Sequence, residues 1–364
     1  MNVKSICDLI EEVAPLSLQE SYDNAGLLVG DAQMEINSVL VSIDITEEVI
    51  EEAIRKNCQM IVSHHPLIFN GLKRLTGQND VQRCVATAIK NDIAIYAAHT
   101  NLDNVLNGVS GKMAEKIGLK NIRILQPKQD RLLKLITYVP HLYADKIRKA
   151  IFEAGAGQIG NYDSCSFNAE GVGTYRANEN ARPFVGDINE LHSEPETRIE
   201  IILPDYLKNR ILEALLKAHP YEEPAYDFIP LQNAWNQVGA GVIGDLAIPE
   251  DELEFLNRIK TIFNIPTIRH TGLLGKKITR VALCGGSGSE FLTDAIKAGA
   301  DVYISGDFKY HQFFDAQKRL VIADIGHFES EQFTKDIFFE IITKKMPTFA
   351  VQISDSKTNP INYL

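Results

Sequence analysis

The stretch Met60–Pro66, with the sequence Met-Ile-Val-Ser-His-His-Pro, decides how the rest of the chain is interpreted. Its short apolar run contains β-branched residues and predicts a buried strand. The strand ends in two adjacent histidines, and Pro66 keeps His65 out of helical dihedrals. Neighbouring side chains of an extended segment point to opposite sides, so His64 and His65 are better placed to bind two different ions than one. Taken alone, the pair also fits two polar loop histidines without a ligand.

The composition is that of a globular protein with more than one domain. The chain has 364 residues, 45% hydrophobic and 23% charged, which allows large cores in two or three domains. The net charge of −11 and the absence of a long basic run disfavour nucleic acid as a partner. Five scattered cysteines without a Cys-x-x-Cys pair favour a reducing compartment. With no signal-peptide pattern and no apolar stretch of membrane-spanning length, we expect a cytoplasmic protein without a membrane segment.

The residues around Met60–Pro66 predict a β-α-β arrangement with a parallel sheet. The expected elements are, in order, the strand Val39–Asp44, the helix Glu47–Asn57, the strand Met60–Val62, the helix Val81–Asn91, the strand Ile93–Ala98 and the helix Val105–Ile117. Function in such sheets lies at the carboxyl ends of the strands. Polar side chains follow all three strands, namely Asp44, then His64 and His65, then His99 and Asp103.

The last third of the chain shows the same order of elements. The expected elements are the strand Arg280–Cys284, the helix Glu290–Ala298, the strand Asp301–Ile304, a helix beginning at His311, and the strand Leu320–Asp324. Twenty positions separate Asp44 from His64 in the first part, and 21 separate Gly286 from Asp307 in the last. We interpret this agreement as an internal repeat of two similar α/β halves.

Both halves carry a histidine with an acid four residues later, beyond the third expected strand. These pairs are His99 with Asp103 and His327 with Glu331. If the halves pack about a pseudo-twofold axis, their strand ends face one crevice and gather five side chains: His64, His65, Asp103, His327 and Glu331. Three imidazoles and two carboxylates suit one or two divalent ions, for which zinc, manganese, iron and cobalt all qualify.

Each residue of this set has a candidate role and a competing structural one. Glu331 could bridge two ions about 3.5–4 Å apart, with Asp44 and His99 behind the ligands, orienting them or moving protons. Alternatively, His327 and Glu331 form a helix-surface pair, since residues four apart share a helix face. Asp103 could instead cap the following helix, and His99 could be a hydrogen-bonded core histidine.

The middle of the chain, from about Pro127, has a different pattern. The expected elements are the strand Leu132–Val139, the helix Tyr143–Ala154, the strand Cys165–Asn168, a loop rich in Gly, Asn and Pro, the strand Arg198–Leu203, the helix Asp205–Ala218 and a strand near Tyr226. This order suggests a ferredoxin-like α+β module. Gly155–Gly160 lacks the Lys-Ser/Thr of a phosphate loop and follows a helix, which favours a plain turn. The predicted fold is therefore α/β, with one discontinuous domain from residues 1–127 and 233–364 and an inserted module at 128–232.

The chain resembles the Nif-three-like family of dinuclear metal-centre proteins, whose members carry the name GTP cyclohydrolase I type 2 homologue. The motifs that carry the resemblance are Tyr22–Leu27, Ser63–Pro66, His99–Asp103, Ser305–Asp307, and Gly326-His327 with Glu331. The resemblance implies a homohexameric toroid with two divalent metal cations per subunit, His64 on one ion and His65 on the other. Asp103 and His327 would complete the two ligand sets and Glu331 would be shared. The middle segment resembles the PII- and CutA-like insertion of longer bacterial members.

Two functions of different classes follow from this reading. In the first, the protein is a metal-dependent hydrolase acting on a small molecule, for which a nucleotide is one candidate. No guanine-reading carboxylate or triphosphate cradle is identified, so the substrate stays unassigned. In the second, the protein is a non-catalytic metal-binding regulatory or scaffold hexamer, in which the ions join the two halves and the inserted module senses a small ligand. A ring that encircles nucleic acid is disfavoured by the acidic balance.

Overall fold

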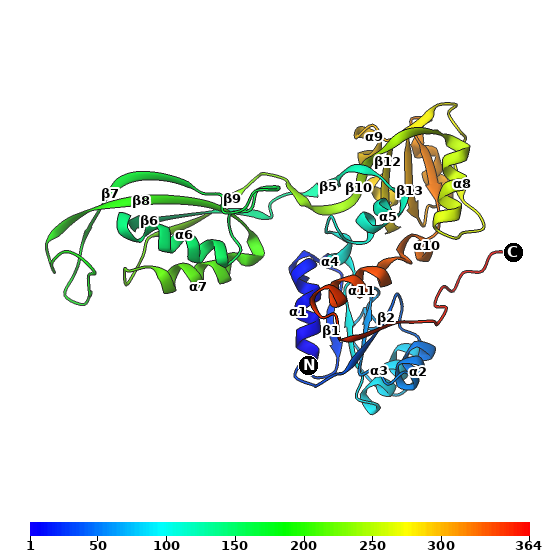
Figure 1. The fold of residues 1–364 in the computed structure, drawn as a ribbon, viewed down its shortest axis with the longest axis horizontal. Helices are drawn as coiled ribbons and strands as arrows, with labels where there is room; N and C mark the ends of the chain where they lie inside the picture. The colour runs from blue at the N-terminus through cyan, green and yellow to red at the C-terminus, as the bar shows by residue number, and fades with distance from the viewer. The chain divides into compact units, whose positions relative to one another are not determined.

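The computed structural model describes residues 1–364, which form a mixed α/β fold with three sheets. The chain divides into two compact units (Figure 1). Unit 1 combines residues 1–127 with residues 237–364, and unit 2 consists of residues 128–236. At this coarse level the α/β class predicted from the sequence is confirmed.

The first sheet of unit 1 is built around the strand that precedes the two histidines. Its order is β1-β4-β3-β2-β15, with β1 antiparallel and the others parallel, and its strands are Gly26–Val29 (β1), Ser38–Ser42 (β2), Met60–Ser63 (β3), Ala94–Ala97 (β4) and Ala350–Ile353 (β15). Strands β2, β3 and β4 are buried along their whole length. That explains their continuous apolar sequences.

Helices cover both faces of this sheet (Figure 1). The helices α2 (Glu47–Arg55) and α3 (Asp80–Lys90) share a hydrophobic core with strand residues such as Leu40, Ile61 and Ile95. The helices α1 (Val3–Val13) and α11 (Thr334–Lys345) contact each other, and α11 also contacts β2 and β15. The end of the chain is thus part of the first sheet's core, an arrangement that the sequence pattern did not indicate.

The second sheet of unit 1 has the order β11-β14-β13-β12-β10-β5. Its strands are Lys120–Lys128 (β5), Trp235–Asp251 (β10), Arg269–His270 (β11), Lys277–Ser287 (β12), Val302–Gly306 (β13) and Val321–Asp324 (β14). Strands β12, β13 and β14 are parallel, whereas β10 runs antiparallel to β12 and β11 runs antiparallel to β14. The helices packed near it include α5 (Val109–Ile117), α8 (Glu252–Ile262), α9 (Leu292–Lys297) and α10 (His327–Glu331).

Two expected helices of unit 1 differ from the structure. The expected helix Val105–Ile117 begins four residues later, as α5 with Gly108 at its N-cap, and a separate short helix α4 (Thr100–Asp103) precedes it. A side chain at that glycine would collide with the carbonyl oxygen of Leu102. The helix expected from His311 is a 3₁₀ helix, Tyr310–Ala316. No helix of the molecule is both long and apolar enough to span a bilayer.

Unit 2 contains a four-stranded antiparallel sheet in the order β7-β8-β6-β9 and two helices. Its elements are β6 (Leu132–Pro140), α6 (Ala144–Glu153), β7 (Phe167–Arg176), β8 (Leu191–Pro204), α7 (Lys208–Ala218) and β9 (Tyr226–Leu231). Helices α6 and α7 lie on one face of the sheet (Figure 1) and share a core with β6 and β8.

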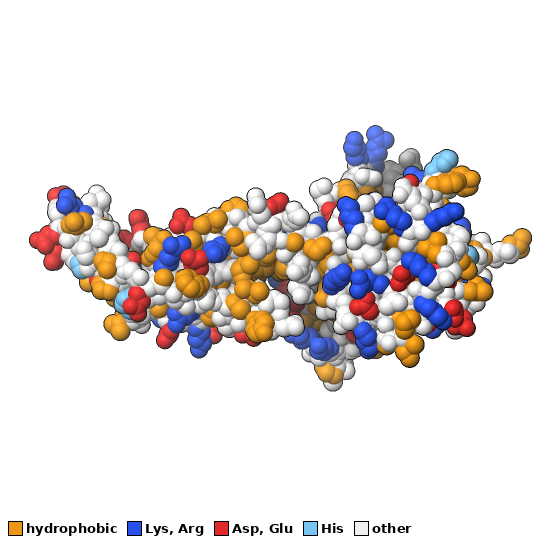
Figure 2. All heavy atoms as spheres, turned by 90° about the horizontal axis from the view of Figure 1, so that it is seen from above, with side chains coloured by type: hydrophobic (Ala, Val, Ile, Leu, Met, Phe, Trp, Pro, Cys, Tyr) orange, Lys and Arg blue, Asp and Glu red, His pale blue; other side chains and the backbone are white.

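The expectation of a loop between Asn168 and Arg198 is wrong for most of its length. Strand β7 continues to Arg176 and β8 begins at Leu191, so only residues 177–190 connect them. Most of β7 is exposed, and its sequence therefore lacks the apolar alternation from which a half-buried strand is predicted. Figure 2 shows hydrophobic and charged side chains of both signs interspersed over the face of unit 2 that is in view.

Candidate metal site

The polar strand ends of unit 1 meet in one cluster of histidines and carboxylates. His64 and His65 follow β3, and both of their backbone N–H groups donate to the carbonyl of Ile43, at 3.1 and 2.9 Å. This turn directs both side chains toward α10, which begins at His327. Nε2 of His65 lies 3.4 Å from Nε2 of His327, although 262 positions separate the two residues in the sequence.

The two histidines that follow β3 are oriented through Nδ1. Nδ1 of His64 lies 2.9 Å from the carbonyl oxygen of Ala98, and Nδ1 of His65 lies 2.7 Å from Oδ1 of Asp44. A carbonyl or carboxylate oxygen only accepts, so in both neutral rings the proton resides on Nδ1. Nε2 of each ring therefore carries a free lone pair that can bind a metal ion. This is the arrangement by which proteins orient metal-binding histidines.

The other two histidines of the cluster are held in the same way. Nδ1 of His99 lies 2.8 Å from Oδ1 of Asp23, and Nδ1 of His327 lies 2.7 Å from Oδ2 of Asp307. Asp23 also accepts from the backbone N–H of Thr100 at 2.9 Å, which fixes its carboxylate. All four rings thus have an oxygen behind them and their second nitrogen available to the cluster.

Glu331 lies at the centre of the cluster and divides it into two groups of donor atoms. Its Oε1 is 3.5 Å from Nε2 of His64, which is itself 3.7 Å from Oδ1 of Asp103. Its Oε2 is 3.1 Å from Nε2 of His65 and 3.3 Å from Nε2 of His327. One carboxylate therefore presents one oxygen to each group.

Several of these donor atoms are buried without a hydrogen bond. Nε2 of His64, Oδ1 of Asp103 and Oε2 of Glu331 are shielded from solvent and have no hydrogen-bond partner of acceptable geometry. Buried polar atoms are nearly always satisfied, and three unsatisfied atoms in one place require an explanation. A bound cation would supply the missing partner to all of them. Two sets of donors could hold a metal ion on geometric grounds: His64, His65 and His99, and His65, His327 and Glu331.

The electrostatics of the cluster also call for positive charge. Five carboxylates surround the rings, and none pairs with a lysine or an arginine: Asp23, Asp44, Asp103, Asp307 and Glu331. Burial lowers the pKa of His65, but the hydrogen bond to Asp44 and the nearby carboxylate of Glu331 outweigh it and raise the pKa to about 10. The carboxylate of Glu331, 3.3 Å away and aided by Asp307, raises the pKa of His327 to about 9. Protons on these rings stand in for cations that the carboxylates favour.

The pKa values of the acids show the same preference. Burial would raise the pKa of Glu331, yet the neighbouring histidines, His64 foremost, hold it well below its usual range. Burial would likewise raise the pKa of Asp44, but its hydrogen bond with His65 lowers it. The pKa of Asp103 is raised by desolvation, since this carboxyl has no hydrogen-bonded partner to stabilise its charge.

Two glycines allow Glu331 and His327 to approach the strand ends. Gly286 has φ +63°, and a Cβ there would stand 2.2 Å from Oε1 of Glu331. A Cβ at Gly306 would stand 2.7 Å from the backbone nitrogen of His327. The next residue, Asp307, has φ +57°, a strained conformation for a non-glycine residue that aims its carboxylate at His327.

The structure brings together all five residues proposed from the sequence as ligands, and places Asp44 and His99 beside them. Glu331 is only 3% exposed, so His327 and Glu331 are not a helix-surface pair. Asp103 does not cap α5, whose N-cap is Gly108. His99 is hydrogen bonded, and its ring also lies against those of His64 and His65.

Sequence reasoning did not assign the partners of two histidines, Asp23 and Asp307. Both residues lie in motifs that carry the family resemblance, Tyr22–Leu27 and Ser305–Asp307, but neither was given a role in the cluster. A third missed residue is Thr358, whose hydroxyl donates to Oδ2 of Asp44 at 2.6 Å. For Thr358 the sequence offers no signal, since its partner is 314 positions away.

Comparison with known proteins places the whole chain among related sequences. The family model described as Duf34/NIF3 (NGG1p interacting factor 3) matches residues 1–360. Proteins named GTP cyclohydrolase 1 type 2 homolog are similar over the full chain. The one from Halalkalibacterium halodurans is 39% identical, and the one from Bacillus subtilis 35%; each comparison covers 100% of this chain and 99% of the relative.

A solved structure shows the same fold. The crystal structure of a Bacillus cereus protein related to NIF3 is 36% identical in sequence and superposes with a TM-score of 0.87. The match covers 100% of this chain and 99% of that one. The fold is therefore supported by similarity along the entire chain.

Proposed function

Because the chain belongs to the DUF34/NIF3 family, we propose that it binds two divalent metal cations per subunit at the histidine–carboxylate cluster and acts as a metal-dependent hydrolase. The observation that carries this proposal is the division of the donors by Glu331. His64 and Asp103 face Oε1, and His65 and His327 face Oε2. A shared carboxylate between two sets of imidazole and carboxylate donors is the usual design of a two-metal site.

The charges of the cluster fit this assignment. Five carboxylates without lysine or arginine partners carry more negative charge than one divalent ion neutralises. Zinc, manganese, iron and cobalt all accept imidazole and carboxylate ligands, so the ligand set alone does not select one of them. When bound, such ions lower the pKa of water and polarise an oxygen of the substrate.

The chain's own residues have separable roles in this proposal. Asp44 and Asp307 fix the rings of His65 and His327 through Nδ1 and make Nε2 a better ligand. His99 is held by Asp23 and keeps a second nitrogen toward the cluster, so it can exchange a proton with a bound substrate.

The substrate class is not assigned by the cluster itself. Relatives carry a name that refers to GTP cyclohydrolase, and a nucleotide is therefore the first small molecule to test. Two exposed aromatic rings lie beside the cluster. Phe69 packs against His99 with 6.4 Å between ring centroids and against Tyr22 with 6.5 Å. Such rings offer a stacking surface for a planar heterocycle.

Metal content decides the first part of the proposal. Elemental analysis of protein purified without added metal should find about two ions per chain, and fewer for Glu331→Gln. His270→Ala is the matched control, because His270 is exposed and lies outside the cluster. Wild-type protein without stoichiometric metal after incubation with each of the four ions would contradict the metal site.

Turnover decides the second part. Stripped and reconstituted protein should be assayed on GTP and on a generic phosphodiester such as bis(p-nitrophenyl) phosphate. Activity that requires the ions and is lost in His65→Ala supports the hydrolase. Metal-loaded protein without turnover on either substrate counts against it.

A second candidate function rests on the origin of the donors. His64, His65 and Asp103 come from the first part of the chain, and His327 and Glu331 come from the last. Bound ions would therefore join two distant segments, in a non-catalytic scaffold or regulatory protein. Loss of metal would then dissociate the assembly, which we propose to be a homohexamer, without changing any turnover. Sedimentation of metal-free and metal-loaded protein distinguishes this outcome.

We also propose that unit 1 contains an internal repeat and that the middle of the chain is an inserted module. Each sheet of unit 1 contains three consecutive parallel strands flanked by an antiparallel strand, β4-β3-β2 beside β1 and β14-β13-β12 beside β11, which supports an internal repeat. The β-α-β-β-α-β order of residues 128–232 supports an inserted ferredoxin-like module of the PII and CutA kind. Expression of residues 128–232 alone, with a cooperative unfolding transition, would show that this segment is an independent module.

A further inference from the structure

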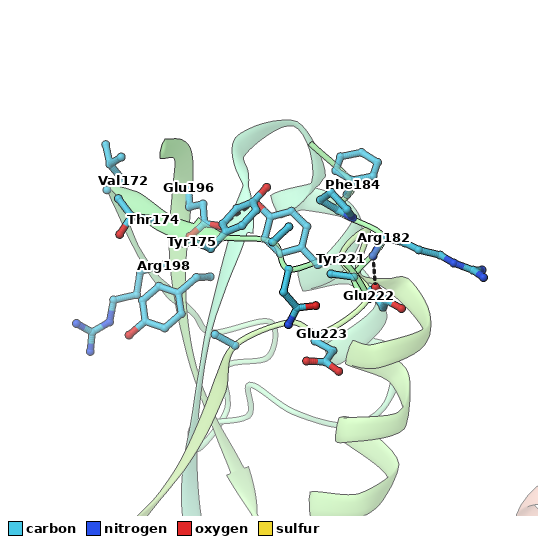
Figure 3. A pocket seen from close by; sticks show the side chains of 18 of the residues that line it. Val172, Thr174, Tyr175, Arg182, Phe184, Glu196, Arg198, Tyr221, Glu222 and Glu223 are labelled. Atoms are coloured by element: carbon cyan, nitrogen blue, oxygen red, sulfur yellow. Dashed lines mark hydrogen bonds between the residues drawn. The ribbon is translucent and has the colours of Figure 1, made fainter. Parts of the chain in front are cut away.

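Unit 2 contains a cavity that the proposed metal chemistry does not use. Its volume is about 860 Å³, within the range of small-molecule sites. The walls are formed by β7, β8, the connection between them and the segment after α7 (Figure 3). The side chains that matter here are Tyr138, Tyr175, Phe184, Glu196 and Tyr221.

A carboxylate without a counter-charge lies in the wall of this cavity. Glu196 on β8 is only 8% exposed, and no lysine, arginine or histidine forms an ion pair with it. Oε1 accepts a hydrogen bond from the hydroxyl of Tyr221 at 2.8 Å, whereas Oε2 accepts none. A buried carboxylate is stabilised when a cation or several donors surround it, and Glu196 has a single neutral donor.

The backbone of β7 makes room for the free oxygen. A Cβ added at Gly173 would stand 2.2 Å from Oε2 of Glu196. The carboxylate can therefore occupy this position only because residue 173 has no side chain. Gly171 lies directly opposite Glu196 in the register of β7 and β8. Both glycines line the cavity, and Oε2 therefore lies at its wall.

The two arginines of the lining do not neutralise Glu196. Arg198 pairs with Glu200 at 2.9 Å. The guanidinium groups of Arg182 and Arg198 both point away from the aromatic rings (Figure 3). Three further carboxylates line the cavity, Glu170, Glu222 and Glu223, and Glu222 accepts from the backbone N–H of Arg182 at 2.8 Å. The interior of the cavity therefore favours positive charge.

Aromatic rings surround the same carboxylate. The ring centroid of Tyr221 lies 6.0 Å from that of Tyr175 and 6.2 Å from that of Phe184. The Tyr175 hydroxyl donates to the carbonyl of Val185 at 2.6 Å, which fixes the ring and the connection that carries Phe184. Aromatic faces attract cations through the ring quadrupole, most strongly where the cation is shielded from water.

We propose that this cavity binds a small organic cation, with its ammonium group between the carboxylate of Glu196 and the rings of Tyr175 and Tyr221. A metal ion fits less well, because Glu196 is the only buried carboxylate of the lining, and one buried carboxylate with phenolic rings is a poor ligand set for it. An anion is disfavoured by the carboxylates. The proposal is independent of the metal cluster, which lies in unit 1.

Calorimetric titration of the full-length protein tests this assignment with choline and spermidine as probes. Choline has a neutral analogue of the same shape, 3,3-dimethylbutan-1-ol, which separates charge from size. We expect at least one amine to bind, and Glu196→Gln to weaken it at least tenfold. Glu213→Gln, which removes an exposed carboxylate of α7 outside the cavity, should leave binding unchanged. The neutral alcohol should bind at least tenfold more weakly than choline.

Three results would overturn the proposal. Neither amine binding at millimolar concentration would exclude an organic-cation site. Equal binding of choline and its neutral analogue would mean a merely apolar cavity. Unchanged binding in folded Glu196→Gln would place the amine elsewhere. If that variant does not fold, Tyr175→Leu replaces it: the loss of one ring should weaken choline binding several-fold, and unchanged binding would count against the proposal.

Discussion

Nδ1 of His65 lies 2.7 Å from Oδ1 of Asp44, and this contact sets which nitrogen of the ring faces the cluster. Both residues follow neighbouring parallel strands, so the backbone of the first sheet fixes their distance. The carboxylate of Asp44 is hydrogen bonded to His65 and Thr358, and not to Glu331 or His327. Its effect on a bound ion therefore has to act through the orientation and basicity of His65.

Asp44→Asn should weaken metal binding without removing a ligand. An amide can turn its NH₂ toward Nδ1, which favours the tautomer with its proton on Nε2. We expect affinity to fall by about 10- to 100-fold, as is typical when such a partner is lost. Competition with a chelator of known affinity measures it. Asp227→Asn, an exposed change in unit 2, is the control, and equal affinities of the two variants would contradict the role of Asp44.

Thr358→Ala should have a smaller effect in the same direction. The Thr358 hydroxyl donates to Oδ2 of Asp44, on the oxygen that His65 does not use. Loss of a hydrogen bond to a charged group costs about 1.5–3 kcal/mol, of which only a part reaches the ion, so we expect affinity to fall about threefold to tenfold. Thr358→Ser keeps the hydroxyl and should restore it. If Ala and Ser variants bind metal alike, the C-terminal segment does not support the site.

The strand ends and their histidines could be predicted because their signals are local. Apolar β-branched runs mark the buried strands β2 and β3, and His64 and His65 follow the second of them. The partners Asp23 and Asp307 could not be assigned in the same way. Each becomes meaningful only when its histidine is known to lie opposite, 76 positions away for Asp23 and 20 for Asp307.

Elements that depend on tertiary pairing were also missed. Strand β15 has four residues, none of them fully buried, and pairing with β2 alone defines it. Strand β7 is held by its ladder with β8 and shows no periodic apolar pattern. Glu52 lies within the expected helix Glu47–Asn57, and nothing in the local sequence indicates that its side chain is buried. In the fold its carboxylate is buried and accepts a hydrogen bond from Ser354 of the C-terminal segment.

Glu52→Gln should remove a pH-dependent part of the stability. The carboxylate accepts from both serine hydroxyls, Ser354 and Ser356, at 2.6 Å, and pairs with Lys56 at 2.6 Å. Burial would raise the pKa of Glu52, but these contacts lower it from 4.5 to about 2. A depressed pKa means that the stabilisation is complete above pH 4.5 and is lost as the pH falls toward 2.

The difference in unfolding free energy between wild type and Glu52→Gln isolates this effect. We expect the variant to be less stable at pH 7 by about 2 kcal/mol. The difference should shrink as the pH falls from about 4.5 toward 2, because the unfolded chain takes up the proton first and the folded carboxyl does so only near pH 2. Urea unfolding of metal-free protein across this range measures it. A difference that does not change with pH would mean that Glu52 is not charged in the folded protein.

Gly286→Ala should abolish metal binding while the fold survives. The residue has φ +63°, and its Cβ would stand 2.2 Å from Oε1 of Glu331, the oxygen that faces His64. The left-handed backbone costs about 1–2 kcal/mol for a non-glycine residue, and the collision displaces the carboxylate. Gly272→Ala is the control, because nothing lies within 4 Å of its Cβ and its φ is not positive. Elemental analysis and thermal unfolding should show a folded, metal-depleted Gly286→Ala protein beside a fully loaded Gly272→Ala protein. Full metal content in the Gly286 variant would mean that the shared position of Glu331 is not needed to hold the ions.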